Sequence, residues 1–284
     1  MDPDIFASLG AMFSFTFLVR AFVVGLLVSL CASLLGVSLV MKRFAMIGDG
    51  LSHVGFGTLA IAAALNVAPL FVSIPVVMTA AFLLLRLSEN SKIRGDAAIA
   101  LISTGSLAVG VMIISLTTGV NTDVNNYLFG SILAMSKNDV YLSVVLSLAV
   151  LILVIFFYHK MFAITFDETF AKAAGVNTGM YNMIIALLTA LTIVLGMRMM
   201  GAMLISSFVI FPALTAMRIF KRFRTVTICA ALVAIACFSI GLAISFLYAT
   251  PAGASIVVMN IIVFFIFWAI SALSRGHAGA YRTL

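Results

Sequence analysis

A succession of nine apolar runs constrains the fold of this chain more than any other feature of its sequence. A helix needs about 20 predominantly apolar residues to cross the hydrocarbon core of a bilayer. The sequence therefore predicts an all-α integral membrane protein, a polytopic bundle of eight to nine transmembrane helices, with residues 1–284 forming a single transmembrane domain. The runs are 18–41, 50–67, 69–87, 96–118, 139–158, 181–198, 199–217, 225–247 and 254–273.

The number of spans depends on the runs 181–198 and 199–217, which only Arg198 and Gly201 separate. Two helices in this stretch give nine spans, whereas one helix followed by a re-entrant piece gives eight. Small residues such as Gly36 and Gly241 recur within the runs, and we expect them to allow close approach of helices in lipid.

The distribution of positive charge favours nine spans and gives them an orientation. With nine spans the basic segments all fall on one side, which the positive-inside rule identifies as the cytoplasm. We therefore predict a multi-pass protein of the prokaryotic cell membrane, with its N-terminus outside and its C-terminus inside. The basic segments are Lys42-Arg43, 86–94, 159–180, 218–224 and the C-terminal end.

Composition excludes several classes of protein. The chain is 64% hydrophobic and 9% charged, against about 25% charged residues in soluble domains, so lipid must cover its apolar surface. Its net charge of +7 lies between apolar runs, which argues against nucleic acid as a partner. The sequence contains no GxxxxGK[ST], HExxH or GxSxG motif, so we expect neither ATP hydrolysis nor peptide cleavage by this chain.

Asp49 and His53 are the pair most able to bind a metal. Ionisable groups are rare in membrane spans because burying them in lipid is costly. A spacing of four residues places both side chains on one helix face, and imidazole with carboxylate suits zinc, manganese or iron. Two alternatives stay open: Asp49 as a helix N-cap, and His53 as an ordinary buried, hydrogen-bonded histidine.

Other polar or soft side chains have simpler interpretations. We expect Arg198 to reach the outer interface, and His159 and His277 to be solvated beside basic residues. The three cysteines form no CxxC pair and are expected to be buried. A methionine cluster is expected to fill apolar space; its members are Met197, Met199, Met200 and Met203.

The segment after Pro212 is expected to leave the bundle. Proline breaks or kinks a helix, and the residues that follow are short in extent, basic and amphipathic. We expect residues 213–225 to lie at the cytoplasmic interface and dock a partner, with 166–177 as the second choice.

Five stretches, taken together and in order, resemble the zinc/manganese/iron permeases of ATP-binding-cassette importers. The first holds Gly48, Asp49, Ser52 and His53, which match the Gly-Asp-x-x-Ser-His motif of that family. The sequence departs from the family at Ala249, where many members have an acidic residue, and at Ser207, where alanine is usual. The stretches are 42–53, 128–133, 166–171 with 175–176, 201–207 with 212–216, and 251–257.

This resemblance implies a helical permease similar to the cobalamin-importer type, with no permanently bound cofactor. It implies a permease homodimer, two cytoplasmic ATP-binding subunits and an extracellular or periplasmic metal-binding protein that delivers the ion. It also places Asp49 and His53 in the metal pathway and implies transport by alternating access. Zinc is favoured, since histidine suits it best, and manganese or iron is the next choice. The rival hypotheses are an ion-coupled secondary metal transporter and an intramembrane enzyme.

Overall fold

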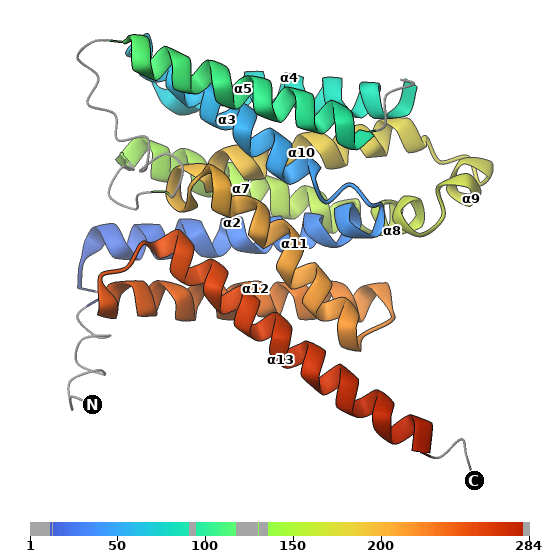
Figure 1. Ribbon diagram of the computed structural model, residues 1–284. Coiled ribbons are helices and arrows are strands. Elements are labelled where there is room, and N and C mark those ends of the chain that lie inside the picture. The colour runs from blue at the N-terminus through green and yellow to red at the C-terminus, as the bar shows by residue number, and fades with distance from the viewer. Residues whose placement is uncertain (1–11, 13, 91–94, 118–129, 131–135, 281–284) are drawn as a thin grey trace.

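The computed structural model describes residues 12, 14–90, 95–117, 130 and 136–280, and within them all regular structure is helical. Most of the long helices alternate in direction along an axis that is roughly horizontal in Figure 1, while α11 and α13 run obliquely to it. The helices are α2 (Thr16–Met41), α3 (Ile47–Ala64), α4 (Pro69–Asn90), α5 (Gly95–Leu116), α7 (Lys137–Phe156), α8 (Tyr158–Phe166), α9 (Glu168–Ala173), α10 (Thr178–Met200), α11 (Ala202–Ile219), α12 (Phe223–Tyr248) and α13 (Ala252–Ala280).

The predicted all-α membrane bundle is confirmed. Each of the nine apolar runs falls in a helix of its own, and in the described residues seven helices are long and apolar enough to cross a bilayer. The two outside that set are α3 and α11, with 18 residues each. The total of nine spans, and the single domain over 1–284, therefore stay predictions.

The stretch 181–217 forms two helices. Helix α10 ends at Gly201, whose φ of +90° is easily reached only by a residue without a Cβ. The chain turns there, and α11 runs back along the bundle (Figure 1). Both nine spans and one span plus a re-entrant piece contain two helices here, so the choice between them stays open.

Pro212 does not end its helix, so the expected departure from the bundle directly after it is wrong, while docking of a partner by residues 213–225 stays a prediction. Helix α11 continues through Pro212 to Ile219, and α12 begins at Phe223. Neighbouring helices stabilise a proline inside a transmembrane helix. Here Ala213 and Ala216 are buried against residues of α2 and α12, so the turn after Pro212 belongs to the core, whereas residues 218–222 are exposed.

Glycine allows two helix crossings at backbone contact, as expected from the small residues. A Cβ on Gly36 of α2 would overlap the carbonyl oxygen of Val209 in α11, and one on Gly241 of α12 would lie 2.6 Å from Cα of Ile256 in α13. Close crossing matters in lipid, since association there depends on packing.

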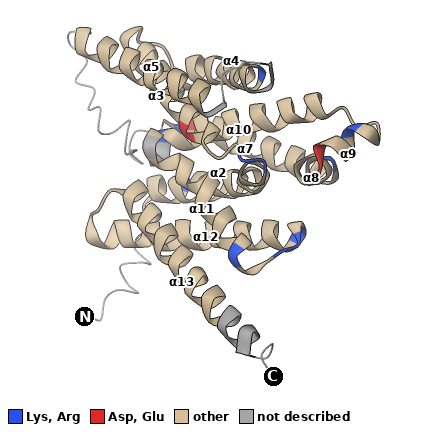
Figure 2. Ribbon diagram, turned by 45° about the vertical axis from the view of Figure 1, so that its right-hand side comes forward, with Lys and Arg blue, Asp and Glu red and all other residues tan. Residues whose placement is uncertain are grey.

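One end of the bundle holds the short helices α8 and α9 together with most of the described positive charge. Figure 2 shows Lys and Arg gathered at this end, around α9, the end of α4 and the connection between α11 and α12. Helix α9 is capped by Asp167, whose carboxylate accepts a hydrogen bond from the backbone N–H of Phe170 at 2.9 Å. We refer to the end of the bundle that holds α8 and α9 as the basic end.

Candidate metal site

Asp49 and His53 lie in the first two turns of α3, as their spacing predicted. The distance from Asp49 Oδ2 to His53 Nε2 is 3.7 Å, which is too long for a hydrogen bond. Asp49 is not the N-cap of the helix, because Met46 occupies that position without any side-chain hydrogen bond. The first alternative for Asp49 is therefore wrong.

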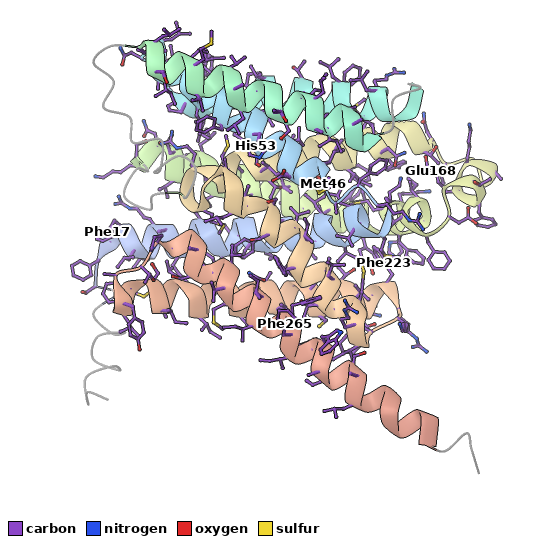
Figure 3. All side chains as sticks on the ribbon, viewed as in Figure 1. Phe17, Met46, His53, Glu168, Phe223 and Phe265 are labelled. Carbon is purple, nitrogen blue, oxygen red and sulfur yellow. The ribbon has the colours of Figure 1, made fainter. Side chains whose placement is uncertain are left out.

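His53 is buried without the hydrogen bonds that an ordinary buried histidine makes. The residue is 9% exposed, and its Nδ1 has no hydrogen-bond partner. An unpaired polar atom inside a protein costs free energy, and a buried imidazole nitrogen without a donor or acceptor is suited to accept a ligand. Figure 3 places His53 midway along α3, between the basic end and the opposite end of the bundle.

The flanking glycines show where this pair points. Gly48 faces Val209 of α11, and Gly50 faces Ile99 of α5. Because successive helical residues are turned by about 100°, Asp49 projects between these two directions, toward the space between α5 and α11. Its side chain remains 36% exposed. The pair is thus buried on one side and open on the other.

Two ligands are all that the described residues supply here. No group of three or more His, Cys, Asp or Glu side chains comes together within the part of the chain that the structure describes. Zinc takes about four ligands and manganese about six, so any ion at this pair needs further ligands from water, backbone carbonyls or another chain.

Arg198 is held by a carboxylate, and its expected place at the outer interface stays a prediction. Its guanidinium Nη2 lies 3.1 Å from Asp139 Oδ2, and the side chains are 9% and 16% exposed. The pair joins the end of α10 to the first turn of α7. Low dielectric strengthens this attraction, which explains why Arg198 stays inside. Because 59 positions separate the two residues, no local sequence pattern indicates this pairing.

A second charged cluster, which the sequence did not reveal, lies at the basic end. Lys42 Nζ is 3.0 Å from Glu168 Oε2 and also donates to Asn182 Oδ1. The amide of Asn182 in turn donates to Glu168 Oε1 at 2.9 Å. These three residues, the Lys42–Glu168–Asn182 cluster, connect the end of α2 with α9 and α10.

The other histidine, cysteine and methionine side chains lie mostly where their sequence context predicts. His159 is exposed, as predicted. Cys31 and Cys237 are buried as expected, but Cys229 is only partly buried. Met197 and Met200 are core residues, and the sulfur of Met197 packs where a Cβ of Gly55 would lie. The side chains of Met199, Met203 and His277, and the stretch 128–133 apart from Gly130, lie outside the described residues.

Three exposed phenylalanines lie on the neighbouring short helices α8 and α9 at the basic end. Phe162 and Phe166 lie on α8 with ring centroids 5.9 Å apart, and Phe170 lies on α9. Phe166 and Phe170 are 73% and 70% exposed. Scattered apolar residues on a lipid-facing helix need no explanation, but this patch lies beyond the membrane-spanning helices and beside basic residues. We call it the α8–α9 patch.

Comparison with known proteins gives consistent relatives. Residues 14–271 match the ABC 3 transport family. The high-affinity zinc uptake system membrane protein ZnuB of Haemophilus influenzae is 31% identical over 88% of this chain and 96% of its own length. The manganese transport system membrane protein MntC of Halalkalibacterium halodurans is 27% identical over 87% of this chain and 85% of its own.

Solved structures show the same architecture. PsaBC from Streptococcus pneumoniae, solved in complex with a Fab, superposes with a TM-score of 0.83 at 27% identity and covers 93% of this chain and 95% of the matched one. An ABC transporter in an inward-facing conformation superposes with a TM-score of 0.70 at 15% identity, over 90% and 86%. The second likeness bears on the fold alone.

Proposed function

Because the chain belongs to the ABC 3 transport family, we propose that it is the membrane-spanning permease subunit of an ATP-binding-cassette importer for a divalent transition metal. Zinc is the first choice and manganese or iron the next, in line with the relatives named for zinc and for manganese. The chain performs transport, and a partner subunit hydrolyses ATP. The metal is cargo and not a resident cofactor.

The observation that carries this proposal is the half-open Asp49–His53 pair on α3. The buried imidazole of His53 has an unpartnered Nδ1, and its Nε2 lies 3.7 Å from the carboxylate of Asp49. Nitrogen and oxygen donors together suit zinc, manganese and iron. Two ligands hold an ion weakly, which transport requires, because the ion must leave the site again.

A second copy of the chain would complete the site. The open side of the pair lies between α5 and α11, and Asp49 is accessible from there. If two copies meet across this face, the second Asp49–His53 pair adds two more donors and gives four, which is the usual number for zinc. We therefore propose a permease homodimer with two ATP-binding subunits and one external metal-binding protein.

Transport would proceed by alternating access. The delivery protein releases its ion to the outer opening, and the ATP-driven change at the basic end re-aims the site toward the cytoplasm. Such coupling requires that the two states bind the ion, or the nucleotide-bound partner, with different affinity. No covalent step occurs in this chain.

The α8–α9 patch is our candidate for the surface that contacts the ATP-binding subunit. Helix α9 is short, stands apart from the main bundle (Figure 1) and presents Phe170 outward. Aromatic side chains are favoured at protein interfaces. The first expectation, residues 213–225, becomes the second candidate: its start is buried in α11, whereas residues 218–222, from the end of α11 to the start of α12, are exposed.

Metal uptake by the assembled transporter tests the proposed function. The chain, its ATP-binding subunit and its metal-binding protein are reconstituted in proteoliposomes, and uptake of radioactive zinc is measured with competing manganese and iron. We expect uptake that requires all three proteins and ATP, with zinc the strongest competitor. Uptake by the chain alone, driven by an ion gradient, would instead establish the secondary transporter.

A further inference from the structure

The Lys42–Glu168–Asn182 cluster closes a ring of contacts between three helices at the basic end. Each oxygen of Glu168 has its own donor, the ammonium of Lys42 at 3.0 Å and the amide of Asn182 at 2.9 Å. Lys42 also donates to Asn182 Oδ1. The Lys42 side chain is 9% exposed, and Asn182 is buried. Lysine is rarely buried this deeply unless it is paired.

The cluster lies directly between the two parts of the molecule that transport must connect. Glu168 is the first residue of α9, which presents Phe170 outward. Lys42 caps the C-terminus of α2, and after the turn 43–46 the chain enters α3, which holds Asp49 in its first turn. The path from the α8–α9 patch to the metal pair thus passes through one ion pair and one short turn.

That turn transmits displacement because it is tightly hydrogen-bonded. The N–H of Phe44 donates to Leu39 O at 2.8 Å and that of Arg43 to Val40 O at 3.1 Å, the two bonds of a Schellman motif. Arg43 takes the left-handed conformation at φ +62°. A turn held in this way cannot lengthen without losing both bonds, so a shift of Lys42 moves the start of α3.

We propose that the Lys42–Glu168–Asn182 cluster couples α9 to the metal-binding helix α3, with Lys42 as the positioning residue. When the ATP-binding subunit displaces α9, Glu168 moves with it. A buried ammonium that loses its carboxylate is strongly disfavoured, so Lys42 follows Glu168 and carries the start of α3 along. This inference rests on the proposed function and adds to it the residues that link the two ends of the mechanism.

The test measures metal uptake per ATP hydrolysed in the reconstituted transporter, for Lys42→Met and for Glu168→Gln. We expect both variants to assemble with the ATP-binding subunit and to hydrolyse ATP within about twofold of the wild type. We expect uptake per ATP to fall about tenfold, which lies within the 5–150-fold range of typical coupling between sites. The exchanged pair Lys42→Glu with Glu168→Lys should recover most of the loss, because it restores the attraction.

Lys160→Met is the matched control, since Lys160 is exposed on the neighbouring α8 and should leave the ratio unchanged. An unchanged ratio in both Lys42→Met and Glu168→Gln would overturn the inference. So would loss of folded transporter in Glu168→Gln, because that variant keeps the hydrogen-bonding shape and its loss would assign the cluster to folding. The proposed function is tested separately, by whether the wild-type transporter couples uptake to ATP at all.

Discussion

Asp49→Asn is the substitution that best separates a metal ligand from a structural carboxylate. Asp49 caps no helix, so asparagine should preserve the fold while removing the charge that a cation needs. Uptake at limiting metal should fall by at least about tenfold, since even losing a group that only supports a metal ligand costs 10–100-fold. Uptake by His53→Ala should fall by as much, and the amount of this variant in the membrane should stay normal.

Asp167→Asn is the matched control for Asp49→Asn. Asp167 caps α9 through the N–H of Phe170, and asparagine caps a helix about as well as aspartate. This variant should transport normally. Normal uptake by Asp49→Asn at limiting metal would remove Asp49 from the candidate site.

We expect the largely buried ion pair of Arg198 and Asp139 to contribute to the stability of the fold. Removing one member of a buried ion pair leaves an unpaired charge and typically costs about 3–5 kcal/mol. Arg198→Met should therefore lower the thermal stability of the purified protein. The double variant Arg198→Met with Asp139→Asn should lose less than the sum of the two single variants. Additive losses would mean that the two side chains contribute independently.

The sequence allowed the metal pair to be predicted but not its surroundings. Asp49 and His53 are close in sequence, so helical periodicity alone brings them together. Arg198 with Asp139, and Lys42 with Glu168, are distant in sequence, and only the packing of whole helices makes them neighbours. Pairings of that kind depend on tertiary structure, which local pattern does not contain.

At the scale of helices, the surface that contacts the ATP-binding subunit can be decided by cross-linking. Phe170→Cys on α9 should cross-link to a cysteine on the partner, because the side chain it replaces is 70% exposed. Phe220→Cys, between α11 and α12, should cross-link much less. Efficient linkage from position 220 alone would return the assignment to the connection between α11 and α12.

The misplaced helix end after Pro212 has a clear physical origin. In water, a proline inside a helix costs about 3 kcal/mol or more, so the sequence favours a break. In a membrane bundle the rest of the helix is held by its neighbours: Ala213, Ala216 and Val37 lie in one buried cluster. Nothing in the residues next to Pro212 shows that these neighbours exist.

For the whole molecule, the testable property is its orientation in the membrane. The test uses a variant whose three cysteines are replaced by alanine, so that a single new cysteine can be labelled. One new cysteine replaces Asn66, between α3 and α4, and another replaces Lys221, between α11 and α12. A maleimide that does not cross membranes should label position 66 from outside intact cells and position 221 only after lysis. Labelling of both from the same side would refute the orientation.

The fold as a whole was more predictable than its details. Lipid imposes helices on any apolar run long enough to span it, so nine runs led directly to nine helices. The stretch around Gly201 was harder to interpret, because one glycine and one arginine had to decide between two spans and one span plus a re-entrant piece. The short helices α8 and α9 lie where the sequence showed only a basic loop.

The contact between Gly36 and Val209 limits what variation the protein can tolerate. Any side chain at position 36 would overlap the carbonyl oxygen of Val209, so α2 and α11 could no longer cross where they do. In a survey of all single substitutions, selected only for growth on scarce metal, Gly36 would therefore tolerate as few substitutions as Asp49. The two positions would differ in the amount of protein that reaches the membrane, which should collapse for Gly36 and hold for Asp49.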